Sequence, residues 1–230
     1  MSTAAKESGR PSPSSFPEAS GLVVRDLRFG DNGPYRFSIG PGRCLGVSGP
    51  SGIGKSLLLR ALVDLDRHQG DVLLGGRSCE SYPAPQWRRL VALVPAEPRW
   101  WYPEVGRHLP PDSDAEEVTA LVEGCGFSRD VLDWQVSRLS TGEKQRLAVV
   151  RALIRRPSVL LLDETGSALD EQAGRRLEQV IADYRRNHEA PVLWVSHDHN
   201  QLDRVADHVL LLGRDRLQIS PLPRQEAAGR

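Results

Sequence analysis

The sequence predicts an α/β fold built on a parallel sheet, and the order of its apolar segments predicts it. A short apolar segment, residues 43–48 (RCLGVS), leads into a glycine-rich loop and then into a leucine-rich helical pattern. Two further apolar segments, residues 159–164 (VLLLDE) and 191–198 (PVLWVSHD), are typical of strands covered on both faces. Between them, apolar residues recur at helical spacing, at Leu177, Val180, Ile181 and Tyr184. Strand, helix and strand in this order favour parallel pairing.

The elements before the glycine-rich loop differ in kind. Residues 1–20 are rich in Ser, Pro and Ala, so we expect a disordered tail. Between residues 22 and 39, LVVRDLRF and YRFSI alternate around GDNGP, which predicts two antiparallel strands joined by a turn. After the loop, we predict further strands in residues 71–78 (DVLLGGRS) and 89–95 (RLVALVP).

A region of different composition follows, from residue 98 to residue 137. It begins with aromatics and prolines and then shows a weaker helical pattern at residues 116–125. We interpret it as a small helical insertion. The predicted organisation is one domain over residues 21–220, with a helical subdomain inserted at 97–145, followed by a C-terminal tail at 221–230.

Composition excludes several classes of protein. Lys plus Arg number 30 and Asp plus Glu number 30, so no net charge draws the chain to nucleic acid or to an anionic membrane. The cysteines Cys44, Cys79 and Cys125 are widely spaced, which suits a reducing compartment better than a disulfide scaffold. No apolar run approaches the roughly 20 residues of a membrane span. We expect a soluble, cytoplasmic chain without direct membrane insertion.

The glycine-rich loop, GPSGIGKS, fits the phosphate-binding pattern G-x-x-x-x-G-K-[ST] at every required position. Its glycines let the backbone curl, so that successive N–H groups point at a nucleotide's phosphates. Lys55 adds a positive charge, Ser56 is a hydroxyl ligand for Mg²⁺, and the following helix points its positive end at the anion. The alternative is a turn that binds nothing. We predict a P-loop nucleotide site formed by Gly49, Pro50, Ser51, Gly52, Ile53, Gly54, Lys55, Ser56 and Leu57.

The VLLLDE segment supplies a second half of such a site. Asp163, at the end of a buried strand, would lie beside Mg²⁺, and Glu164 could accept a proton from an attacking water. Carboxylates also cap strand ends without any chemistry. With the P-loop upstream, we interpret Asp163 as a metal-site residue and Glu164 as catalytic.

The segment Leu139-Ser140-Thr141-Gly142-Glu143 precedes a predicted helix and contains a capping box, Ser140 with Glu143 three residues later. It also resembles the signature sequence of ATP-binding cassette (ABC) ATPases, with Thr141 in place of the usual first glycine and Glu143 in place of the usual glutamine. This resemblance implies a P-loop NTPase with a RecA-like core, an antiparallel β subdomain and a small helical subdomain, and it implies ATP and Mg²⁺ as ligands.

Further segments extend the resemblance over residues 22–212. SALD at residues 167–170 is similar to the D-loop of the family, and His197 is similar to its switch histidine, which contacts the γ-phosphate. Ser196-His197-Asp198 is no hydrolytic triad, because successive residues point apart. The resemblance implies a nucleotide-sandwich homodimer, in which Ser140 and Gly142 meet the γ-phosphate held by the partner subunit.

Two family features are altered. The aromatic that stacks on adenine is predicted to be Phe29, with Tyr35 as the alternative, and either could belong to the core instead. The glutamine that usually follows the strand at 89–95 is missing, with Ala96 in its place. The neighbouring Glu97 either substitutes for it or is a solvated loop residue.

These features predict the ATPase subunit of an ABC transporter, peripheral on the inner face of the membrane and partnered with a separate permease. Segments such as VLLLDE, SALDE and VLWVSHD look like those of small ATPases paired with iron-export-type permeases. The alternatives are a soluble ABC ATPase, such as one for iron–sulfur cluster assembly, and a nucleotide-dependent kinase, against which the signature argues. The consecutive aromatics Trp100, Trp101 and Tyr102 are either a docking surface for the permease or partly core.

Overall fold

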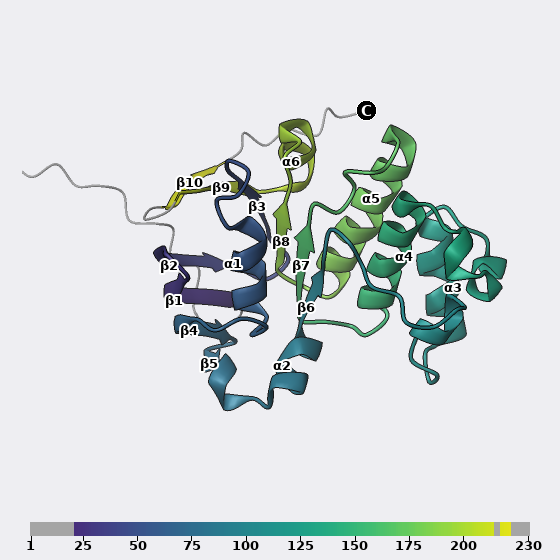
Figure 1. Cartoon of the computed structure of the whole chain (residues 1–230), viewed down its shortest axis with the longest axis horizontal. Coiled ribbons are helices and arrows are strands. Elements are labelled where there is room, and N and C mark those ends of the chain that lie inside the picture. The colour runs from purple at the N-terminus through teal and green to yellow at the C-terminus, as the bar shows by residue number, and fades with distance from the viewer. Residues whose placement is uncertain (1–20, 214–216, 222–230) are drawn as a thin grey trace, which may run out of the picture.

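The structure is a computed structural model that describes residues 21–213 and 217–221. The predicted N-terminal tail, residues 1–20, lies outside the described residues, as does the predicted C-terminal tail except for its first residue. Figure 1 shows a layer of strands on its left and a group of helices on its right, with a second layer of strands between them.

The central sheet has six strands in the order β10-β9-β3-β8-β7-β6. Neighbouring strands from β9 to β6 run parallel, and β10 is antiparallel to β9. The parallel α/β sheet predicted from the sequence is therefore present, with one antiparallel edge strand added. Its strands are β3 (Cys44–Ser48), β6 (Val91–Val94), β7 (Val159–Asp163), β8 (Val192–Val195), β9 (His208–Leu212) and β10 (Leu217–Pro221).

Both faces of the central strands are buried, which explains their unbroken apolar sequence. Along β7, Leu161 belongs to a core shared with the antiparallel sheet, whereas its neighbours Leu160 and Leu162 belong to a second core shared with the large helices. The same alternation places Leu193 of β8 in the first core and Trp194 in the second. Successive side chains of a strand point to opposite faces, so one apolar run fills two cores.

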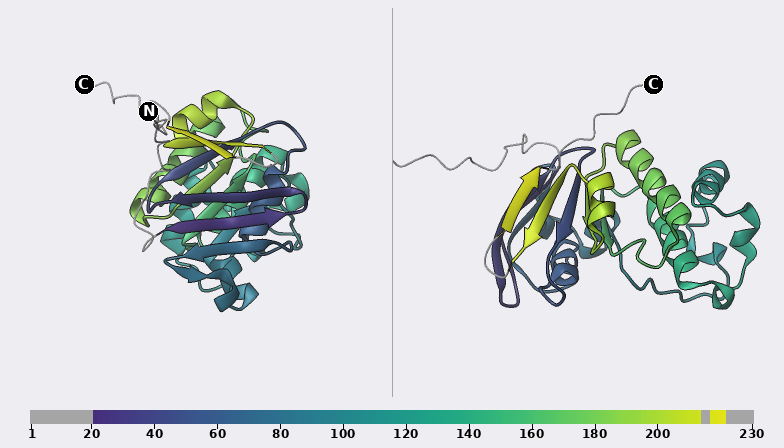
Figure 2. Two further views of the ribbon diagram at one scale, coloured as in Figure 1. Left: turned by 90° about the vertical axis from the view of Figure 1, so that its left-hand side faces the viewer. Right: turned by 90° about the horizontal axis from the view of Figure 1, so that it is seen from above.

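A second sheet is antiparallel, with strand order β2-β1-β4-β5. Figure 2 shows its strands lying across one side of the central sheet, and in Figure 1 helix α1 (Lys55–Leu62) lies between the two sheets. Residues of α1 and of this sheet share the first core. The strands are β1 (Leu22–Phe29), β2 (Asn32–Ile39), β4 (Gln69–Leu74) and β5 (Arg77–Ser78).

Helices α3 (Ala115–Gly124), α4 (Thr141–Leu153) and α5 (Glu171–Asn187) lie on the opposite side of the central sheet (Figure 1). Each begins at a residue that can cap it: Asp114, Ser140 and Asp170 accept hydrogen bonds from backbone N–H groups of the first turn. Between β6 and α4 the chain forms α3 and the short 3₁₀ turns η2 (Gly106–His108), η3 (Arg129–Asp133) and η4 (Val136–Arg138).

Several short elements were not predicted from the sequence. They are η1 (Cys79–Ser81), α2 (Ala84–Leu90), α6 (His199–Val205), β9 and β10. The helical elements among them have seven or fewer residues, so they carry too few repeats for a helical pattern. Among the described residues, no helix is long and apolar enough to cross a bilayer.

Candidate functional site

The phosphate loop joins β3, which ends at Ser48, to α1, which begins at Lys55. Gly52 has φ 76° and Gly54 has φ 105°, a region that favours glycine. A Cβ on Gly54 would also lie 2.9 Å from Nδ2 of Asn32, so a larger residue would require the Asn32 side chain to shift. The first N–H groups of α1 have no carbonyl partner within the helix, and a phosphate could accept hydrogen bonds from them.

Lys55 lies folded across this loop and is only 6% exposed. Its Nζ donates hydrogen bonds to the carbonyl oxygens of Gly49 (2.9 Å) and Pro50 (3.1 Å). These are neutral acceptors, and a phosphate oxygen would make a stronger, charge-assisted bond with the same ammonium. The Lys55 ammonium therefore already lies at the site where an anion would bind.

The remaining predicted loop residues contribute in different ways. The side chain of Ile53 packs against the first core, whereas Leu57 is 47% exposed. Ser51 is exposed. For Leu57 the backbone N–H at the start of α1 is thus the group available to a phosphate, as predicted for a P-loop.

Asp163 ends β7 at the same edge of the sheet as the phosphate loop. Burial raises the pKa of its carboxyl group, while a hydrogen bond from Ser56 and the charges of Lys55 and His197 lower it. These interactions place the two predicted metal-site residues, Asp163 of β7 and Ser56 of α1, close together. Lys55 of α1 and His197, which follows β8, lie near the same carboxylate.

The donor set fits Mg²⁺. Oδ1 of Asp163 is buried and has no hydrogen-bond partner within the described part of the chain, so a carboxylate oxygen is available to a ligand. Ser56 adds a hydroxyl oxygen, and hard oxygen ligands are those that Mg²⁺ prefers. Within the described ranges, 21–213 and 217–221, no group of three or more His, Cys, Asp or Glu side chains could hold a metal. A cation here would take further ligands from phosphates and water, as Mg²⁺ commonly does.

The two predicted catalytic residues contact one another. Nε2 of His197 lies 2.7 Å from Oε1 of Glu164. Glu164 follows β7 with φ 50°, a left-handed conformation that is uncommon for a residue other than glycine. Its backbone N–H donates to the carbonyl of Val195 at 3.0 Å, which ties it to the end of β8. The structure thus orients a carboxylate and an imidazole as a pair beside the phosphate loop.

The signature segment lies at the start of α4. Ser140 and Glu143 form the predicted capping box, with Ser140 N to Glu143 Oε2 at 2.8 Å and Glu143 N to Ser140 Oγ at 3.2 Å. A Cβ on Gly142 would lie 2.8 Å from Leu169 and 2.9 Å from the carbonyl of Ala168. Gly142 is therefore required for close contact with the D-loop segment. Within the described residues, no hydrogen bond joins Ser140 to the phosphate loop.

The predicted adenine-stacking residue lies in the first core. Phe29 is 4% exposed, and its ring centroid is 5.6 Å from that of Tyr35, which is fully buried. Cε2 of Phe29 lies 3.4 Å from the position that a Cβ on Gly54 would take. The ring therefore adjoins the loop, and it is almost fully covered in this structure. Stacking of Phe29 on adenine stays a prediction.

Gln145 is a residue that the sequence reasoning missed. It is 3% exposed, and its Nε2 donates to the carbonyl of Ala96 at 3.0 Å, which joins the signature helix to the loop after β6. Glu97 beside it is exposed. Helical spacing could have identified Gln145. Gly142, Gln145, Val149 and Leu153 recur three and four residues apart, and all four lie on the buried face of α4.

Comparison with known proteins adds the family. A family model described as ABC transporter matches residues 33–167. The aliphatic sulfonates import ATP-binding protein SsuB 1 of Nocardia farcinica (strain IFM 10152) is 35% identical over 197 residues, which cover 83% of this chain and 77% of that protein. The zinc import ATP-binding protein ZnuC of Paramagnetospirillum magneticum (strain ATCC 700264 / AMB-1) is 36% identical over 178 residues, covering 77% of this chain and 66% of that one.

A solved structure shares the fold. The structure of a bacterial Atm1-family ABC exporter with ATP bound superposes with a TM-score of 0.80 over 91% of this chain, at 21% identity. The chain spans 40% of the length of that exporter. A P-loop, an acidic strand end and a signature helix on this fold, together with the family match, show that the chain belongs to the ABC transporter family and is its ATP-binding subunit, an ATPase.

Proposed function

We propose that the chain works as a nucleotide-sandwich homodimer that powers a separate membrane permease. The observation that carries this proposal is the division of the site within one chain. Lys55, Ser56, Asp163 and Glu164 gather at one sheet edge, whereas the capped start of α4 has no hydrogen bond to the phosphate loop among the described residues. A second subunit could bring its own Ser140 and Gly142 to that loop.

The residues divide the chemistry between them. The loop N–H groups and Lys55 would bind the β- and γ-phosphates, and Ser56 and Asp163 would hold Mg²⁺. Bound Mg²⁺ neutralises charge on the phosphates. Glu164 would accept the proton of the attacking water. Nε2 of His197, 2.7 Å from the Glu164 carboxylate, would hold that carboxylate in position. Ser140 and Gly142 of the partner subunit would offer hydroxyl and backbone donors to the γ-phosphate.

The names of the relatives bear on the type of permease and on its cargo. Relatives are named as import ATP-binding proteins for sulfonates or zinc, which favours an import permease over the iron exporter predicted from sequence phrasing. The same names favour a transporter subunit over an iron–sulfur assembly ATPase. We propose that the chain lies on the cytoplasmic face of the membrane and is held there by this permease.

The test is the mass of the Glu164→Gln variant in solution, measured by size exclusion with light scattering. We expect a monomer without nucleotide and a dimer with MgATP, because binding is retained and hydrolysis no longer opens the dimer. The double variant Glu164→Gln, Lys55→Ala is the matched control and should stay monomeric. A Glu164→Gln protein that binds MgATP and remains a monomer would contradict the sandwich.

A further inference from the structure

A groove of about 680 Å³ lies between α5 and α6, which Figure 1 shows next to each other at the top of the molecule. It is lined by Cys44 of β3, Trp194 of β8, Ile181 and Arg185 of α5, and Val205 at the end of α6. None of the described residues that line it belongs to the nucleotide site, so the groove is a separate feature of the fold.

Trp194 offers this groove a buried donor without an acceptor. It is 1% exposed, and its Nε1 has no hydrogen-bond partner in the described part of the chain. Its side chain belongs to the second core, together with Ile181 and Val205, so it points to the side of the sheet on which the groove lies. An indole N–H can only donate, and a buried donor left unpaired is costly.

Arg185 offers a second donor. Its Nη1 donates to the carbonyl of Val205 at 3.4 Å and to Oδ2 of Asp207 at 3.1 Å, whereas its Nε is buried and has no hydrogen-bond partner among the described residues. The thiol of Cys44 also contacts Arg185, but burial raises the pKa of this thiol to about 12, and a neutral sulfur is a weak acceptor. Both unpaired groups in the groove are therefore donors, which a ligand with acceptor oxygens would satisfy.

The positive charge of Arg185 is only partly balanced. The Asp207 carboxylate also accepts hydrogen bonds from Nη1 of Arg43 at 3.2 Å and from the backbone N–H of Cys44 at 2.8 Å. One negative charge is therefore shared between two guanidinium groups. An anion in the groove would be attracted by the remaining positive charge, more strongly than in open solvent because the site is partly buried.

A second carboxylate at the groove is shared in the same way. Glu178 accepts two hydrogen bonds from Arg204, at 2.7 and 3.0 Å, and Arg175 lies 4.0 Å from it. Asp203, the third acid that lines the groove, is exposed, so solvent screens its charge. The acids of the groove are thus paired or solvated, which leaves its arginines to bind a ligand of opposite charge.

The groove also lies against both helices that follow predicted catalytic segments. Helix α5 begins directly after residues 167–170, and α6 begins two residues after His197. Glu178 accepts a hydrogen bond from Nε2 of Gln201 at 3.3 Å, and that nitrogen lies 3.0 Å from the position of a Cβ on Gly166, two residues after Glu164. A ligand that moves α5 relative to α6 would therefore be felt at the nucleotide site.

We propose that this groove, here called the α5–α6 groove, binds a small organic carboxylate with an apolar body, and that its occupancy is coupled to the nucleotide site. The carboxylate would accept from Trp194 and Arg185, and the apolar body would lie against Ile181 and Val205. A volume of about 680 Å³ is within the usual range for small-molecule sites. The inference goes beyond the proposed function, because it needs neither a permease nor a second subunit.

The test is an NMR titration of the ¹⁵N-labelled full chain with benzoate as the probe. The indole resonance of Trp194 is identified by its loss in Trp194→Phe. We expect it to move to higher proton frequency as the N–H gains an acceptor, with a dissociation constant below about 1 mM. Benzamide, which has the same shape without the charge, should bind at least about 10-fold more weakly.

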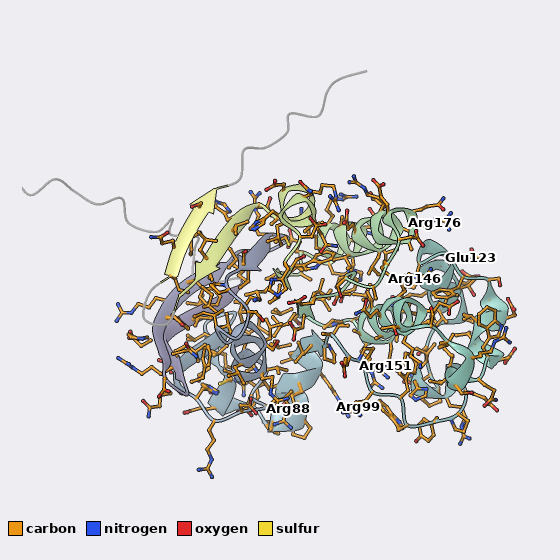
Figure 3. All side chains as sticks on the ribbon, turned by 45° about the horizontal axis from the view of Figure 1, so that its top comes forward. Arg88, Arg99, Glu123, Arg146, Arg151 and Arg176 are labelled. Carbon is orange, nitrogen blue, oxygen red and sulfur yellow. The ribbon has the colours of Figure 1, made fainter. Side chains whose placement is uncertain are left out.

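Variants locate the site. Arg185→Gln should lower benzoate affinity about 10-fold or more, with a thermal melt to check folding. Arg176→Gln is the matched control on the same helix and should stay within about 2-fold of the parent. Figure 3 labels Arg176, whose Nη1 lies 2.8 Å from the position of a Cβ on Gly126, a residue that does not line the groove.

The coupling is measured in Glu164→Gln, which removes the proposed base. Benzoate affinity should differ by about 5-fold or more between the nucleotide-free and the MgATP-bound protein. Equal affinities would overturn the coupling. No movement of the Trp194 indole resonance at about 10 mM benzoate, or equal binding of benzamide, would overturn the site itself. Loss of benzoate binding in Lys55→Ala would assign the anion to the phosphate loop and would also overturn the proposal.

Discussion

Replacing Glu164 with Gln removes a proton acceptor while changing little else. The two side chains have nearly the same shape, and an amide oxygen can still accept a hydrogen bond from Nε2 of His197 at the 2.7 Å separation seen for the carboxylate. Loss of a general base typically costs about 10²- to 10⁴-fold in rate, which corresponds to about 2.7 to 5.4 kcal/mol at 1.36 kcal/mol per tenfold. We expect the rate of ATP hydrolysis to fall within this range.

The assay is phosphate release at saturating MgATP, with nucleotide affinity measured in parallel. Affinity should be unchanged, because Lys55 and the loop N–H groups remain. Glu97→Gln is the matched control, since it makes the same chemical change at an exposed loop position, and its rate should stay within about 2-fold of the parent. Parental hydrolysis by Glu164→Gln would refute the role of Glu164, and a large loss in Glu97→Gln would move the base to the loop after β6.

Three further predictions follow from buried titratable side chains. Lys55→Ala should lower nucleotide affinity about 10-fold or more with little change in melting temperature, as checked by titration and thermal melts. Burial raises the pKa of Asp163 in the folded chain, so its charge destabilises the fold at neutral pH. Asp163→Asn should therefore raise the melting temperature of the nucleotide-free protein while abolishing hydrolysis. A lower melting temperature would contradict this. Because burial lowers the pKa of His108 on folding, its stabilising contribution is present above about pH 6.5 and is lost as pH falls. The difference in free energy of unfolding between the parent and His108→Gln, measured in denaturant titrations, should therefore shrink toward about pH 5.

The phosphate loop and the end of β7 were predictable because their chemistry needs particular residue types at particular spacings. Lys55 must follow the glycines, and Asp163 must end a strand next to the same sheet edge. The two-core burial of β7 and β8 followed from their unbroken apolar sequences. The capping box of Ser140 was equally local, since both of its residues lie within one helical turn.

Contacts between distant segments could not be read in this way. Phe29 is the last residue of β1. Its exposure depends on how β2 and α1 pack around it, and the ring is buried against Tyr35. His108 carries no motif, because its function in the loop comes from a turn that brings its imidazole back to the N–H groups of Trp101 and Tyr102. Its neutral state is a property of that fold rather than of the local sequence.

A complementation experiment tests the composite site most directly. Lys55→Ala removes the phosphate-loop cation, and Ser140→Asp keeps a good helix cap while placing a negative charge where the γ-phosphate of the partner subunit would lie. Each variant alone should be nearly inactive. In an equal mixture, half of the dimers pair the two variants and contain one complete site of two, so we expect about a quarter of the parental ATPase rate. A mixture as inactive as its components would contradict a site shared between two subunits.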